Sequence, residues 1–78
     1  MMTPTSTNKL LGQSIRQKRI ALGLSQEKLA ELSGLHRTYI GQLENGKKSP
    51  TLKTLFLIAK ALRIKPTELV RDIEDRCH

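Results

Sequence analysis

Residues 25–46 read SQEKLAELSGLHRTYIGQLENG and contain two short helical patterns separated by a glycine. Ser25 is a favourable N-cap for a helix over 26–33, and Gly34 is suited to end that helix in a left-handed conformation. A further helix over about 36–45 follows and is ended by Gly46. Its first residues include no strong N-cap, so tertiary packing must help it to form. Two short helices joined by a glycine-containing turn of three or four residues are typical of a helix-turn-helix.

The helix over 36–45 has two different faces. At about 100° per residue, its apolar side and the edge of that side carry Tyr39, Ile40, Leu43 and Glu44. The opposite side is polar and carries Arg37, Thr38, Gly41 and Gln42. Arg pairs with guanine, Gln with adenine, and Thr offers a methyl and a hydroxyl group in the major groove of DNA. The polar side suits a helix in that groove, although an ordinary solvated surface has the same polarity.

Helical patterns also precede and follow this pair. A first helix is predicted over about 8–22, with Leu11, Ile15, Leu22 and Leu24 inward. In the helix over 26–33, Leu29, Ala30 and also Leu32 are candidates for the inward side. Thr51 caps a fourth helix whose apolar stripe is Leu52, Leu55, Ile58, Ala59 and Leu62. Pro66 fits the first turn of a fifth, to about residue 72. We therefore predict an all-α, compact five-helix bundle over 9–73, with a flexible arm at 1–8 and a tail at 74–78.

The chain is strongly basic, with 14 Lys and Arg against 7 Asp and Glu and a formal charge of +7. Residues 1–65 carry twelve basic and three acidic side chains, whereas residues 66–78 carry two and four. A positive body of this size attracts a polyanion, from which we expect the acidic end to be turned away. No membrane-spanning run, secretory signal or interfacial anchor is evident, and Cys77 has no partner for a disulfide, so we expect a cytoplasmic protein without membrane association.

The residue inventory gives no sign of an enzyme. There is no glycine-rich phosphate loop, no His, Cys and acid cluster at metal spacing, and no evident nucleophile and base. We therefore expect neither catalysis nor a cofactor or metal. The main alternative is an interaction or antitoxin module of the same fold, but such a surface would more often expose apolar anchors on the helix over 36–45. RNA is disfavoured because a helix does not enter the narrow major groove of an A-form duplex.

The stretch IRQKRIALGLSQEKLAELSGLHRTYIGQLENGKKSPTL, residues 15–52, resembles the Cro/cI-type helix-turn-helix family, also called the xenobiotic-response-element family. The likeness extends over 11–70 and rests on spaced elements, among them GLSQExLA and YIxxLExG. HRTYI is most similar to restriction-modification controller proteins, and QLENGK also resembles lambdoid phage repressors. The resemblance implies a lambda-repressor-like domain that regulates transcription by binding double-stranded operator DNA. We expect no sensor domain after the fifth helix and therefore no small-molecule effector.

The resemblance also implies roles for single residues. Positions that contact bases in the family are occupied by Arg37, Thr38 and Gln42. Positions that contact the DNA backbone are occupied by Gln26, Tyr39 and Asn45, and the amides of 46–49 should approach it, with Lys47, Lys48 and Ser49 in that loop. The two lysines could equally be solvated. Arg19 and Glu44 match a structural ion pair that joins the first helix to the end of the third.

We expect a homodimer on an inverted-repeat operator, because one recognition helix reads only four or five base pairs and this class binds two half-sites about one helical turn apart. Candidates for the shared surface are Leu69, Val70 and Ile73 in the fifth helix and Phe56 or Leu57 in the fourth. For Leu69 and Val70 the alternative is that they close the core of the monomer.

Overall fold

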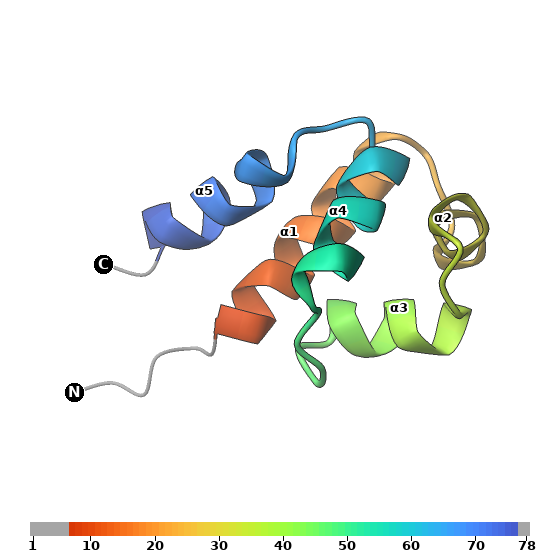
Figure 1. Cartoon of the computed structure of the whole chain (residues 1–78), viewed down its shortest axis with the longest axis horizontal. Helices are drawn as coiled ribbons and strands as arrows, with labels where there is room; N and C mark the ends of the chain where they lie inside the picture. Colours follow the sequence, from red (N-terminus) through yellow and green to blue (C-terminus); the bar gives the residue numbers. More distant parts are fainter. Residues whose placement is uncertain (1–6, 77–78) are drawn as a thin grey trace.

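The structure, a computed structural model, describes residues 7–76 and contains five helices and no strand in that range (Figure 1). In chain order they are α1 Thr7–Ala21, α2 Gln26–Ser33, α3 Arg37–Glu44, α4 Leu52–Ala61 and α5 Pro66–Arg76. The all-α prediction is confirmed.

The helix boundaries follow from local chemistry. The hydroxyl oxygen of Ser25 accepts a hydrogen bond from the backbone N–H of Lys28 at 2.9 Å, which caps α2. Thr51 caps α4 in the same way, through the N–H of Thr54 at 3.1 Å. Gly34 ends α2 with a φ of 73°, and the N–H of Leu35 returns to the carbonyl of Ala30 at 3.0 Å. The chain can therefore turn sharply between α2 and α3.

One apolar core joins all five helices. α1 packs against α3 and α5, α2 packs against α3 and α4, and α4 packs against α5. The buried apolar side chains are Leu11, Ile15, Leu29, Ala30, Ile40, Leu43, Ile58, Ala59, Leu62 and Leu69. Every helix contributes to this set, so the pair α2 and α3 is held by the same core as the rest of the chain.

Three leucines that we predicted to lie inward are exposed instead. Leu22 is 46% exposed because it follows the last residue of α1, where the helical periodicity no longer applies. Leu32 is 51% exposed, on the outer side of α2. Leu52 is 71% exposed because it is the first residue of α4, and no other helix covers that turn. The inward predictions for these three side chains are wrong.

The predicted arm and tail need partial correction. α1 begins at Thr7, so residues 7–8 belong to a helix, and the rest of the predicted arm lies outside the described residues. α5 continues to Arg76 rather than ending near Asp72, since no glycine or proline stops it. Residues 74–76 of the predicted tail are therefore helical, and Cys77 lies outside the described range.

A polar contact fixes α5 on α1. The Asp72 carboxylate accepts hydrogen bonds through Oδ2 from the hydroxyl of Ser14 and from Nζ of Lys18, both at 2.6 Å. Figure 1 shows that α5 lies at the opposite end of the molecule from α2 and α3. The acidic segment is thus placed away from the helix-turn-helix.

Candidate nucleic-acid interface

α3 lies across the lower edge of the molecule in Figure 1, whereas α2 is seen nearly end on, so the two helices cross steeply. His36 is the N-cap of α3, but its side chain makes no capping hydrogen bond. The helix is instead held by its inner side, where Ile40 and Leu43 are completely or almost completely buried. As the sequence suggested, packing rather than a cap forms this helix.

A buried carboxylate fixes the C-terminal end of α3. Nε of Arg19 on α1 lies 2.6 Å from Oε2 of Glu44, and Nη2 donates to Oε1 at 3.1 Å. The same Oε1 accepts a hydrogen bond from the Gln26 amide at 3.0 Å. Arg19 also donates through Nη1 to the Leu24 carbonyl at 2.7 Å. We call Arg19, Gln26 and Glu44 the clamp, since they tie α1 and the start of α2 to the end of α3.

The clamp is well satisfied electrostatically. The Glu44 side chain is only 2% exposed, and its two oxygens receive three donors, two of them from a guanidinium. A buried charge needs such a set of partners, because an unpaired carboxylate in the interior is very costly. The role of the clamp is therefore to fix one orientation of α3 relative to α1 and α2.

The close approach of α1 to α3 depends on Gly12, which sequence reasoning did not single out. A Cβ atom added to Gly12 would collide with the Leu43 carbonyl oxygen and would lie 2.6 Å from that of Glu44. The backbone of α1 therefore lies directly against the end of α3. Gly12 lies within a helix and not at a left-handed turn, so no local pattern in the sequence indicates this close contact.

The outer face of α3 is polar throughout. Arg37 and Thr38 are exposed at its start, and Gly41 and Gln42 are half-buried one turn later. The three predicted base-contacting side chains are thus brought to one surface without an apolar side chain among them. That composition suits the edges of bases better than the apolar anchor of a protein partner.

The predicted backbone-contacting residues flank this face. Asn45, Lys47, Lys48 and Ser49 are exposed in the segment after α3, at the end that the clamp fixes. Tyr39 is half-buried and packs against the core. Gln26 is half-buried, and its side-chain amide donates a hydrogen bond to Glu44, so this residue also braces the end of α3. No local pattern in the sequence indicates that partner, which lies 18 residues away.

A metal site and a membrane-spanning helix are both absent from the part of the chain that the structure describes. Residues 7–76 contain no group of three or more His, Cys, Asp or Glu side chains that could hold a metal ion. None of the five helices in that range is both long and apolar enough to cross a membrane. The candidate site is the polar face of α3 with its flanks, because the exposed polar side chains there suit contact with DNA.

Comparisons with known proteins agree with this reading of the fold. A family model described as helix-turn-helix matches residues 15–69. Control protein C.SmaI of Serratia marcescens is 47% identical over 62 residues, which cover 80% of this chain and 74% of that protein. The crystal structure of the restriction-modification controller protein C.AhdI from Aeromonas hydrophila has a TM-score of 0.79 at 47% identity, covering 80% of this chain and 94% of that one.

A further solved structure is that of the restriction-modification controller protein C.Esp1396I, as a tetramer in complex with its natural 35 base-pair operator. Its TM-score is 0.82 at 29% identity, and the match covers 94% of this chain and 96% of that chain. Together with the family model and the relatives above, these matches confirm the resemblance seen in the sequence. The chain belongs to the Cro/cI-type helix-turn-helix family.

Proposed function

We propose that this protein is a transcriptional regulator that binds an inverted-repeat operator in double-stranded DNA as a homodimer, with α3 in the major groove. The observation that carries the proposal is the polar outer face of α3, held in one orientation by the buried clamp. Support also comes from the similar controller protein C.Esp1396I, whose structure contains its operator. The alternative of an interaction module is not favoured, because the outer face of α3 presents no apolar anchor.

Base recognition is assigned to Arg37, Thr38 and Gln42. The guanidinium of Arg37 is suited to pair with O6 and N7 of guanine, and the amide of Gln42 with N6 and N7 of adenine. Thr38 offers a methyl group to thymine and a hydroxyl group to neighbouring polar atoms. Their placement on one exposed face of a fixed helix allows all three to act on neighbouring base pairs.

Contacts with the DNA backbone are assigned to Gln26, Tyr39, Asn45, Lys47, Lys48 and Ser49. These residues lie at the start of α2 and along and after α3, so they can approach the phosphates on the two sides of the groove that α3 occupies. Such contacts set the register of the protein on the duplex but do not read its sequence. The lysines add attraction that weakens as salt rises.

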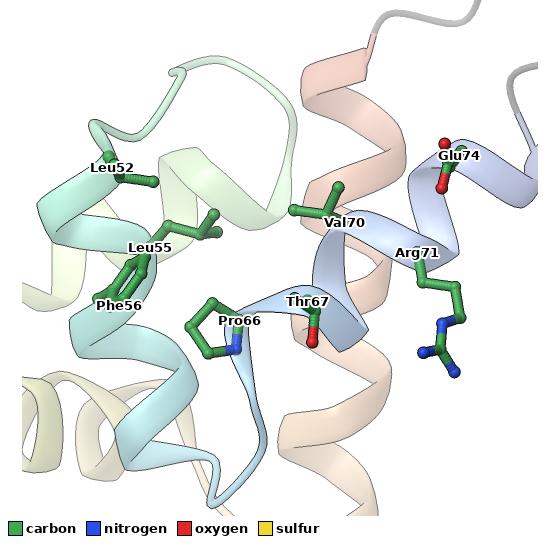
Figure 2. Close-up of a pocket in the computed structure, with 8 residues that line it drawn as sticks. All are labelled: Leu52, Leu55, Phe56, Pro66, Thr67, Val70, Arg71 and Glu74. Atoms are coloured by element: carbon green, nitrogen blue, oxygen red, sulfur yellow. The ribbon is translucent and has the colours of Figure 1, made fainter.

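The dimer surface is assigned to an apolar groove between α4 and α5, with a volume of about 430 Å³. Figure 2 shows Leu52 and Leu55 on α4 pointing toward Val70 on α5, with Phe56 beside them. Leu52, Phe56 and Val70 are 71%, 55% and 48% exposed. Apolar side chains gathered in this way on a small protein mark a binding surface, and a second copy of the same groove would cover them.

Charges along α5 are consistent with a self-complementary surface. Arg71 and Glu74 also line the groove, so a two-fold axis could pair each with the opposite charge of the partner. Ile73 is half-buried against the core and contributes less free surface. Leu69 is 0% exposed, so the core alternative applies to it and it does not belong to the dimer surface.

The proposal is tested by selecting bound duplexes from a random DNA pool at about 150 mM salt, which suppresses non-specific phosphate binding. We expect a short inverted repeat whose half-sites are centred about 34–36 Å apart. A variant with Arg37, Thr38 and Gln42 all changed to alanine should fold normally and enrich no such repeat. Absence of enrichment with the unchanged protein would contradict the proposed function.

A further inference from the structure

Four of the five glycines are required by the structure of the chain itself. Gly23, Gly34 and Gly46 have φ values of 72°, 73° and 75°, which side chains rarely tolerate. Gly12 lies where α1 meets the carbonyl groups of Leu43 and Glu44, so it has no room for a Cβ. Each of these glycines is thus explained by a turn or by a close contact between helices.

Gly41 is different, because nothing in the described residues requires it. It lies within α3 without a positive φ, and an added Cβ would meet only Oε1 of Gln26, at 3.8 Å, which is ordinary van der Waals contact. Alanine would fit there and is a much better helix former than glycine. A glycine that weakens an eight-residue helix, with no internal reason, indicates a requirement from whatever contacts the outer face of α3.

The chemistry around Gly41 limits which group of a base can contact it. The Gly41 carbonyl already accepts the N–H of Asn45 at 3.0 Å, so the residue offers mainly the apolar Cα methylene. A methyl-sized group placed at the position of the missing Cβ would meet only Oε1 of Gln26, at 3.8 Å, so there is room for one such group beside Cα. The 5-methyl group of thymine is apolar, projects into the major groove and has the size of the missing Cβ.

We propose that Gly41 is a specificity-determining residue that accepts the 5-methyl group of a thymine against its Cα. The inference rests on the proposed function, in which α3 lies in the major groove. Thr38 lies three residues before Gly41 and Gln42 follows it, so this thymine lies among the base pairs that those side chains contact. Glycine at this position lowers the stability of α3 but allows the helix to approach the bases in the major groove more closely.

The test compares the unchanged protein with Gly41→Ala on the duplex recovered by selection, with each half-site thymine replaced in turn by uracil. On the thymine duplex, Gly41→Ala should bind about tenfold more weakly, as for loss of one base contact. At one thymine position, the uracil duplex should bind both proteins nearly equally, because the removed methyl leaves room for the new Cβ. Gln17→Ala, at an exposed position of α1, is the control and should bind both duplexes like the unchanged protein.

Stability is measured in parallel by thermal unfolding. Gly41→Ala should raise Tm by about 4–8 °C, as expected for the gain in helix propensity in a domain of this size. A lower Tm would show that the fold itself requires Gly41 and would overturn the proposal. So would unchanged affinity of Gly41→Ala, or a tenfold loss that persists with uracil at every position. Failure of the unchanged protein to select any duplex would instead overturn the proposed function, and this inference with it.

Discussion

Nε of Arg19 and Oε2 of Glu44 lie 2.6 Å apart, and the Glu44 side chain is only 2% exposed. Arg19 belongs to α1 and Glu44 is the last residue of α3, so this contact joins two helices through residues that are 25 positions apart in the chain. Gln26 completes the arrangement from the first residue of α2. The orientation of the proposed DNA-reading face therefore depends on a buried charge rather than on apolar packing alone.

Breaking the Arg19–Glu44 pair should be strongly destabilising. Arg19→Ala leaves the Glu44 carboxylate buried without its cationic partner, so the free energy of unfolding should fall by about 3–5 kcal/mol. Urea denaturation followed by circular dichroism measures the loss. The exposed pair of Lys28 and Glu31 is the control, and Lys28→Ala should cost less than about 1 kcal/mol. Equal small losses for both variants would contradict the structural role of the clamp.

Gly12→Ala should destabilise the protein even though alanine favours helices. The new Cβ would collide with the backbone carbonyl groups at the end of α3, which can move only if α1 and α3 separate. We expect the free energy of unfolding to fall by about 1–3 kcal/mol, as for other overpacked cores. The same denaturation experiment measures it, and a gain in stability would show that α1 and α3 do not approach as closely as described.

Charges placed in the α4–α5 groove should separate the dimer without unfolding the chain. Phe56→Lys and Val70→Lys each put an ammonium group in a surface that is exposed in the monomer but covered in the proposed dimer. Sedimentation velocity should show monomers, with an unchanged helical circular dichroism spectrum and weaker binding to the full operator. Ile20→Lys, at a residue that is 54% exposed outside the groove, is the matched control and should remain dimeric. If Phe56→Lys and Val70→Lys sediment like the control, the dimer uses another surface.

Local signals in the sequence predicted most of the helices. Ser25 with Gly34 bounded α2 correctly, because a cap and a left-handed glycine act within a few residues of the helix that they end. The end of α5 was missed by four residues, since neither glycine nor proline follows Asp72 and the apolar stripe fades there. The exposure of Leu52 could not be predicted, because its helical spacing is that of a core residue. It is exposed because no other helix, α5 included, covers the first turn of α4.

The candidate site was also only partly predictable, because local patterns do not indicate contacts between residues that are far apart in the chain. The polar face with Arg37 and Gln42 follows from helical periodicity within eight residues. The Gln26–Glu44 hydrogen bond and the contact of Lys18 with Asp72 join residues 18 and 54 positions apart, for which the sequence has no local pattern. Such contacts become evident only when the helices are placed relative to one another.

The central claim is that α3 reads base pairs, and the most direct measurement is the affinity of Arg37→Ala for the selected operator and for duplexes that differ from it at one base pair. We expect a loss of about 1–3 kcal/mol in binding free energy and a relaxed preference at a single base pair in each half-site. Lys48→Ala, as the control, should weaken binding to all duplexes alike and reduce the salt dependence. An equal loss for Arg37→Ala on every duplex, with all base preferences retained, would contradict the claim that Arg37 on α3 reads a base.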